Sequence, residues 1–338
     1  MRFCCENAGI YDFYNEENVP NAIYPEIIGY YLTYISYLKS LQISIPNEIV
    51  EHAKRTITLL GESIHNSGIP VKIYSNMVIE KYYGFDLAMI GNGLLSFKEV
   101  FNNSEFDETI IKVYTKLVDN FFENNLLKCA VITEDTLEEN WSHHLGQYHL
   151  KLILFLHKMN ENFKVENKNL IESLKKQIIE NYLHQDLLIN DITRKGYHLH
   201  PYCYGVEGLL YHYHFFKKNE DRDELRRIVK KMFSHQFPLR YVENGIANKT
   251  IRNDITAQLL RIHKYSNFLL GDLNTNKETI ELLNKILEEY ELECGSYSFG
   301  QNSKGLELKH PNSWVTFMSH QTYLMSSENM NLSLRYMI

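Results

Sequence analysis

Several large protein classes are excluded by what this sequence lacks. No apolar run approaches the length that spans a bilayer, and residues 1–6 are not followed by the apolar core of a signal peptide. We therefore expect a cytoplasmic protein with no membrane partner. The five cysteines show no C-x-x-C spacing, so the sequence predicts neither a disulfide framework nor a zinc knuckle. Reduced thiols and no metal site are expected.

Basic charge and cofactor motifs are also scarce. The formal net charge is −7, and in the one basic run, residues 222–231, the charges alternate with acidic and apolar side chains. This pattern argues against nucleic acid as a partner. The chain has no phosphate-binding glycine loop, no Rossmann fingerprint and no serine nucleophile elbow. We predict no bound cofactor.

The composition that is present suits a folded globular protein. Of 338 residues, 44% are hydrophobic, 13% aromatic and 23% charged, which provides ample material for a core. No linker and no shift in composition divides the chain. The sequence therefore predicts a single domain over residues 1–338.

Apolar segments with helical spacing alternate with amphipathic ones along the chain. The predicted apolar helices cover residues 23–38, 85–97, 143–159, 198–213, 253–263 and 312–325. The predicted amphipathic helices cover residues 46–66, 105–124, 167–183, 222–237 and 277–292. A short β-like piece at 71–74 and a β-hairpin within 295–308 are the predicted strands.

Polar residues at the N-terminal ends of the apolar helices recur about every 50 to 60 residues, at Glu26, Asp86, His144, Tyr204, Asp254 and Trp314. A helical hairpin repeated six times buries its core by stacking neighbours. Closure into a ring is economical because we see no polar cap at either end. We predict an all-α (α/α)6 toroid, in which parallel inner helices gather their N-terminal ends at one mouth.

The densest of these ends is the segment 198–213. If Pro201 lies in the first helical turn, then His200, Tyr204 and Glu207 follow at i, i+4 and i+7 and share one face. An imidazole, a phenol and a carboxylate on one stripe are well suited to line a polar cavity. The competing interpretation is a structural histidine with a partly buried tyrosine.

Aromatic, carboxylate, amide and imidazole groups at all six ends are what a sugar-binding cleft needs. The predicted catalytic residues are Glu207, Asp254, His200 and Asp86. The predicted substrate-binding residues are Tyr24, Glu26, Trp141, His144, Tyr204, Gln258, Trp314 and Gln321. Each has a structural alternative: helix capping for the two aspartates, core packing for Trp314, and hydrogen bonds between inner helices for the two glutamines.

Two reactions fit these groups. A carboxylate pair drawn from Glu26, Asp86, Glu207 and Asp254 would serve glycoside hydrolysis, one as acid and one as base. His144 or His200 would instead pass a proton at a sugar carbon, as in epimerisation or elimination. We favour a glycoside hydrolase-like enzyme acting on an acidic or acetamido sugar or oligosaccharide. The alternatives are a cofactor-independent sugar epimerase or isomerase, and a non-catalytic sugar- or peptide-binding toroid of a biosynthetic cluster.

Five helix starts resemble those of bacterial six-hairpin glycosidase-like proteins: Tyr24-Pro-Glu-Ile-Ile-Gly-Tyr30, Phe85-Asp-Leu-Ala-Met-Ile-Gly-Asn-Gly-Leu94, His200-Pro-Tyr-Cys-Tyr-Gly-Val-Glu-Gly-Leu209, Asp254-Ile-Thr-Ala-Gln-Leu-Leu-Arg261 and Asn312-Ser-Trp-Val-Thr-Phe-Met-Ser-His-Gln321. The resemblance implies the toroid fold far more than a reaction, because the superfamily includes unsaturated-uronyl hydrolases, N-acylglucosamine 2-epimerases and polysaccharide lyases. The chain lacks the D-x-D-D run of prenyltransferases and cyclases and the zinc ligands of lanthionine cyclases.

Overall fold

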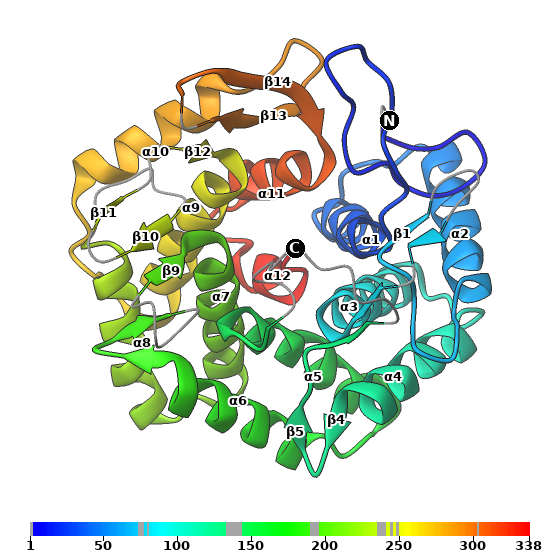
Figure 1. The fold of residues 1–338 in the computed structure, drawn as a ribbon, viewed down its shortest axis with the longest axis horizontal. Helices are drawn as coiled ribbons and strands as arrows, with labels where there is room; N and C mark the ends of the chain where they lie inside the picture. Colours follow the sequence, from blue (N-terminus) through cyan, green and yellow to red (C-terminus); the bar gives the residue numbers. More distant parts are fainter. Residues whose placement is uncertain are drawn as a thin grey trace. The chain divides into compact units, whose positions relative to one another are not determined.

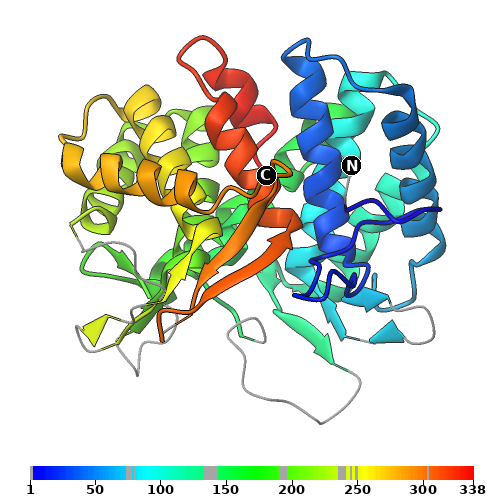
Figure 2. The same ribbon diagram turned by 90° about the horizontal axis from the view of Figure 1, so that it is seen from above.

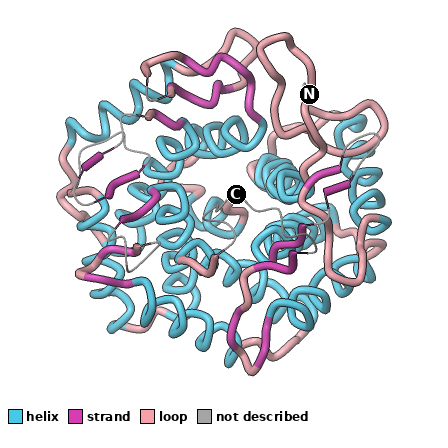
Figure 3. The backbone as a smooth tube through the Cα atoms, in the orientation of Figure 1, coloured by secondary structure: helices cyan, strands magenta, loops and turns pink. Residues whose placement is uncertain are grey.

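The structure is a computed structural model that describes residues 3–73, 78–79, 81–132, 144–189, 196–234, 241–243, 246–247, 250–302 and 304–338. Helices predominate, and the strands are short (Figure 3). The chain forms two compact units. Unit 1 comprises residues 1–145, 154–171 and 335–338, and unit 2 comprises residues 146–153 and 172–334. The single domain over 1–338 remains a prediction.

Unit 1 contains two complete helical hairpins. It also contains most of the first helix and the start of the second helix of the third hairpin. Its helices are α1 (Pro25–Ser40), α2 (Asn47–Glu62), α3 (Gly84–Phe101), α4 (Asp107–Phe121), most of α5 (Leu152–Phe163) and the start of α6 (Lys168–Tyr182). Its antiparallel strand pairs are β1 (Lys72–Ile73) with β2 (Val78–Ile79), β3 (Lys81–Tyr83) with β6 (Ala130–Ile132), and β4 (Phe122–Glu123) with β5 (Leu126–Leu127).

Unit 2 contains the remaining helices: the 3₁₀ helix η2 (Gln147–Lys151), the rest of α6, α7 (Leu199–Phe216), α8 (Asn219–Met232), α9 (Asn253–Leu270), α10 (Lys277–Glu289), α11 (Ser313–Leu324) and α12 (Met330–Arg335) up to its last residue (Figure 1). Its strands are β7 (Leu183–His184), β8 (Leu187–Leu188), β9 (Gly196–His198), β10 (Tyr241–Glu243), β11 (Ile246–Ala247), β12 (Ile251–Arg252), β13 (Tyr297–Gln301) and β14 (Glu307–Asn312).

Burial follows the predicted alternation of helices. In α1 every residue from 25 to 37 is buried, and in α7 every residue from 199 to 213. The following amphipathic helices bury one stripe only: α10, for example, buries Leu283, Ile286 and Leu287. A helix that is apolar all round is stable only when protein surrounds it. The odd-numbered helices α1, α3, α7 and α9 therefore carry the cores of their units.

Several of these buried helices begin directly where a short strand ends. Strands β3, β9, β12 and β14 run without a loop into α3, α7, α9 and α11, so the residue before each helix has an extended backbone. Figure 2 shows β12, β13 and β14 gathered at one end of the helices of unit 2. The predicted hairpin within 295–308 is confirmed by β13 and β14. The other strands were not predicted, except near 71–74.

Glycines let some buried helices approach to backbone contact. A Cβ on Gly93 of α3 would lie 2.3 Å from the carbonyl oxygen of Gly29 of α1, and one on Gly29 would lie 2.4 Å from that of Met89. In unit 2, a Cβ on Gly208 of α7 would lie 2.3 Å from the carbonyl oxygen of Leu150. Real Cβ atoms cannot come so close, so only glycine is compatible with these packings.

The predicted helix over 143–159 is wrong at its N-terminal end. Gly146 is fully extended, the 3₁₀ helix η2 follows it, and the α-helix starts only at Leu152. The apolar pattern continues through both helices because all five residues of η2 are buried, so hydrophobicity alone could not separate them. His144, expected at a helix start, lies in an exposed bend before Gly146.

Candidate functional site

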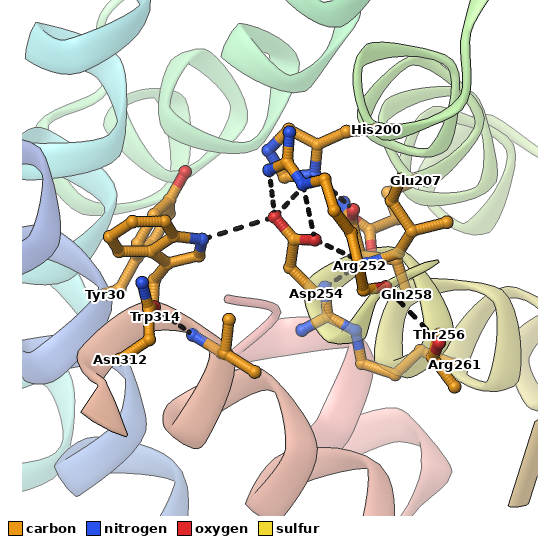
Figure 4. Close-up of polar contacts among 12 residues, drawn as sticks. Tyr30, His200, Glu207, Arg252, Asp254, Thr256, Gln258, Arg261, Asn312 and Trp314 are labelled. Atoms are coloured by element: carbon orange, nitrogen blue, oxygen red, sulfur yellow. Dashed lines mark hydrogen bonds and ion pairs between the residues drawn. The ribbon is translucent and has the colours of Figure 1, made fainter. Parts of the chain in front are cut away.

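Three helices of unit 2 carry polar residues with matching spacing. The i, i+4, i+7 series predicted for α7, formed by His200, Tyr204 and Glu207, recurs on α9 as Asp254, Gln258 and Arg261. On α11, Trp314 and Gln321 occupy the i and i+7 positions of the same series. Except for Trp314, which is half-buried, all of these side chains are buried. Hydrogen bonds between these helices form two layers: His200 with Gln258 in the first, and Arg261 with Glu207 and Gln321 in the second (Figure 4 shows His200, Gln258, Glu207 and Arg261).

The first layer surrounds Asp254 and is called here the His200 cluster: His200, Arg252, Asp254, Gln258 and Trp314. Arg252, the last residue of β12, donates to both carboxylate oxygens of Asp254, with Nε 3.0 Å from Oδ1. Trp314 Nε1 donates to Oδ2 over 3.3 Å. Burial alone would raise the pKa of Asp254, but these groups outweigh it and lower the pKa to about 2. Asp254 is therefore a carboxylate at neutral pH.

His200 is held beside this carboxylate. Its Nδ1 lies 2.6 Å from Gln258 Oε1 and 3.5 Å from Asp254 Oδ2. Both neighbours are acceptors, so the arrangement favours a proton on Nδ1 and leaves the lone pair on Nε2. Burial, reinforced by the charges of Arg252 and Lys151, lowers the pKa of His200 to about 4 against the opposing effect of Asp254. The imidazole is neutral at pH 7 and suited to accept a proton.

The second layer is called here the buried ion cluster: Lys151, Glu207, Arg261 and Gln321. Glu207 accepts from Lys151 Nζ at 2.9 Å and from Arg261 at 2.5 Å, and Arg261 also donates to Gln321 Oε1 at 2.7 Å. The side chains of Lys151, Glu207 and Arg261 have no exposed surface. A charge so deeply buried requires such pairing. Glu207 is therefore paired with two cations.

The charged partners in these layers were not predicted. Lys151, Arg252 and Arg261 lie within or next to the predicted apolar segments, where single cations carry no clear signal. One signal was present: Asp254, Gln258 and Arg261 repeat the i, i+4, i+7 spacing that singled out His200. The spacing argument that applies to α7 also applies to α9, and it places Arg261 on the same polar stripe as Asp254 and Gln258.

Unit 1 has its own cluster of ionisable groups at the start of α1 and α3. Tyr30 donates to Glu26 Oε1 over 2.5 Å, and Tyr24 also hydrogen-bonds Glu26. Asp86 is 6% exposed, and its Oδ2 has no hydrogen-bond partner among the described residues. Burial, together with the charge of Glu26, raises the pKa of Asp86 well above its usual range. Asp86 is thus suited to remain a protonated acid.

Neither aspartate occupies an N-cap position, which was the structural alternative for both, although Asp254 Oδ1 accepts from the first-turn backbone N–H of Ile255 over 2.8 Å. Tyr83 and Arg252 occupy the N-cap positions of α3 and α9, so Asp86 and Asp254 lie inside the first turns. Gln321 does join an inter-helix hydrogen bond, through Arg261. Trp141 lies outside the described residues. The described residues contain no group of three or more His, Cys, Asp or Glu side chains that could hold a metal ion.

Solved structures with the same fold are known. A cellobiose 2-epimerase from Bacillus thermoamylovorans has a TM-score of 0.76 at 11% identity, over 95% of this chain and 93% of that one. A D-mannose isomerase has 0.73 at 12%, over 95% and 93%. An unsaturated glucuronyl hydrolase from a Bacillus species, responsible for glycosaminoglycan degradation, has 0.64 at 10%, over 93% and 90%. No protein-family model and no curated protein sequence matches the chain.

These likenesses establish the fold. They extend over nearly the whole chain, and they confirm the predicted all-α (α/α)6 toroid, with a short β-hairpin near the C-terminus. In the part of the chain that the structure describes, no helix is long and apolar enough to cross a membrane. At 10–12% identity the likenesses do not assign a reaction.

Proposed function

We propose that this chain is a cofactor-independent sugar epimerase or isomerase in which His200 is the general base. The observation that carries the proposal is the environment of His200, whose Nδ1 faces Gln258 and the carboxylate of Asp254. A neutral imidazole oriented by acceptors is the arrangement that general-base catalysis uses. The sequence alone had favoured hydrolysis by carboxylates, with this reaction as the alternative.

The carboxylates of unit 2 fit hydrolysis less well. A glycosidase needs one protonated and one ionised carboxyl group. Asp254 is held ionised by Arg252 and is therefore not poised to give a proton. Glu207 is bound by Lys151 and Arg261 and has no exposed surface from which to reach a substrate. In this proposal Asp254 orients His200, and Glu207 serves the buried ion cluster.

The proton transfer balances without a further reactant. His200 Nε2 takes the proton from the carbon next to the aldehyde of an open-chain sugar, and the electron pair of the broken C–H bond forms an enediolate. Return of that proton to C1, together with transfer of the O2 hydroxyl proton to O1, gives a ketose. Delivery of a proton to the opposite face of C2 gives the epimer and requires a second acid. Neighbours described as a cellobiose 2-epimerase and a D-mannose isomerase support this class of substrate.

Exchange with deuterated water tests the proposal directly. The protein is incubated in D2O with a panel of aldoses and disaccharides that includes mannose, cellobiose and N-acetylated and acidic sugars. We expect deuterium to enter at one sugar carbon without cleavage of a glycosidic bond. We expect this exchange to be lost in His200→Asn. Exchange that persists undiminished in folded His200→Asn would refute the role of His200. Release of a reducing sugar without exchange would refute the reaction class.

A second candidate, glycoside hydrolysis, is favoured by one specific observation in unit 1. Asp86 combines a strongly raised pKa with an unpartnered buried oxygen and lies in the electrostatic reach of Glu26. Two carboxyl groups whose environments separate their protonation states form an acid and base pair. Under this candidate, Asp86 protonates the oxygen of the leaving group.

The two candidate functions predict that different variants are inactive. Under the hydrolase candidate, hydrolysis of unsaturated uronyl disaccharides should be abolished in Asp86→Asn and retained in His200→Asn. The loss of absorbance of the double bond measures this hydrolysis. Under the epimerase proposal, His200→Asn abolishes turnover and no unsaturated disaccharide is cleaved. Thermal melting of both variants checks that each remains folded.

A further inference from the structure

Lys151 is a charge near His200 to which the proposed reaction gives no role. It comes from the 3₁₀ helix η2, and its ammonium lies 4.2 Å from the centre of the Tyr204 ring. The ring of Tyr204 in turn lies 4.4 Å from the imidazole of His200, tilted by 57°. The phenol ring of Tyr204 therefore contacts both the ammonium of Lys151 and the imidazole of His200. All three are buried, which keeps water from screening the charge.

Glu207 explains how Lys151 can carry a charge there. Its carboxylate binds Lys151 on one side and Arg261 on the other, and none of the three side chains is exposed. A buried ammonium without such a partner would lose its proton. The buried ion cluster thus fixes a positive charge beside the Tyr204 ring that His200 contacts.

We propose that Lys151 is a positioning residue whose charge, held beside the ring of Tyr204, lowers the proton affinity of the His200 imidazole. The inference rests on the proposed function in one respect, because His200 is the general base of the proposed reaction. Lys151 has no exposed surface from which to contact a sugar. Its effect on the reaction is therefore carried by His200.

Some of the groups around His200 raise its pKa and others lower it. Asp254 favours the imidazolium, whereas Arg252 and Lys151 oppose it, and Gln258 accepts from Nδ1. The two ring contacts place the Lys151 ammonium within about 9 Å of the imidazole. At an effective dielectric constant of about 20, a unit charge at that distance changes a pKa by about one unit.

The test is a titration of His200 by NMR in the absence of substrate. The histidines are labelled with ¹³C in the ring, and the His200 signal is identified by its absence in His200→Asn. We expect Lys151→Met to raise the pKa of His200 by about one unit. Lys151→Arg, which keeps the charge, should leave it near the wild-type value. Because Lys151→Met leaves Glu207 paired with Arg261, the interior retains balanced charges.

A matched control comes from the same unit. Lys175 binds Asp221, which lies 3.8 Å from His212 Nε2, and the charge of Lys175 adds to burial in lowering the pKa of His212. Lys175→Met should therefore raise the pKa of His212 and leave His200 unchanged. If Lys151→Met does not fold, Lys151→Gln replaces it. An unchanged His200 pKa in the folded variant overturns the inference, whereas inactivity of the wild type on sugars would count only against the proposed function.

Discussion

Lys158 of α5 gives the most quantitative prediction. Its side chain has no exposed surface, and its ammonium lies 2.6 Å from Ser96 Oγ and 5.3 Å from the centre of the Tyr336 ring. Burial lowers its pKa from 10.5 to about 8, with Glu99 opposing and Arg335 adding to the shift. A depression of this size corresponds to about 3 kcal/mol of differential stability.

The sign follows from proton binding. Because the pKa in the folded protein lies below that of the unfolded chain, the unfolded chain holds more protons between pH 8 and 10.5. The wild type should therefore gain stability as the pH rises through this range. Below pH 8 the full penalty of burying the charge is present. Lys158→Met removes that penalty and loses a hydrogen bond worth about 1 kcal/mol.

We therefore expect Lys158→Met to be more stable than the wild type by about 2 kcal/mol at pH 7, and about as stable as the wild type at pH 10, where the remaining penalty of about 1 kcal/mol offsets the lost hydrogen bond. Urea unfolding of both proteins between pH 7 and 10 measures the difference. Lys112→Met, which removes an exposed lysine of a surface pair, is the control and should show no such slope. A difference between wild type and Lys158→Met that stays constant with pH would refute the reasoning.

Three further predictions concern packing, buried charge and acid. Gly93→Ala forces a Cβ to within 2.3 Å of the Gly29 carbonyl oxygen, so we expect loss of more than about 2 kcal/mol in denaturant titrations, with Gly295→Ala, which has open space, as the milder control. Glu207→Leu removes the carboxylate that binds two buried cations and should lower stability by about 3–5 kcal/mol, a loss that a catalytic role alone would not cause. Burial lowers the pKa of His149 to about 3, so it contributes stability above pH 6.5 that is lost as the pH falls toward 3; His149→Gln should flatten that part of the stability profile.

The sequence was informative where structure depends on neighbouring residues. Helix type and the order of buried and amphipathic helices follow from hydrophobic periodicity, which is a local property, and the start of α7 before Pro201 follows from the geometry of proline. The start of α5 was missed because η2 is buried throughout and so continues the apolar pattern.

The candidate site was only partly predictable because its contacts are long-range. Lys151 and Glu207 are 56 residues apart, and Arg261 and Gln321 are 60 apart. A single sequence shows which helix faces are polar, but it does not show which charges on different helices meet. His200, Asp254 and Gln258 were named and lie together, whereas the cation that holds Asp254, Arg252, became visible only through its contacts.

The matching spacing on α7 and α9 also limits how such a chain can change during evolution. One residue inserted between Asp254 and Arg261 would rotate Arg261 by about 100° around the helix axis relative to Asp254. The His200 cluster and the buried ion cluster could then not both form, whichever layer kept its place. Insertions and deletions should therefore be tolerated in the loops between hairpins and be rare in the first two turns of these helices. The site would be inherited as a fixed length of helix, and substrate range could change mainly through the connections that surround it.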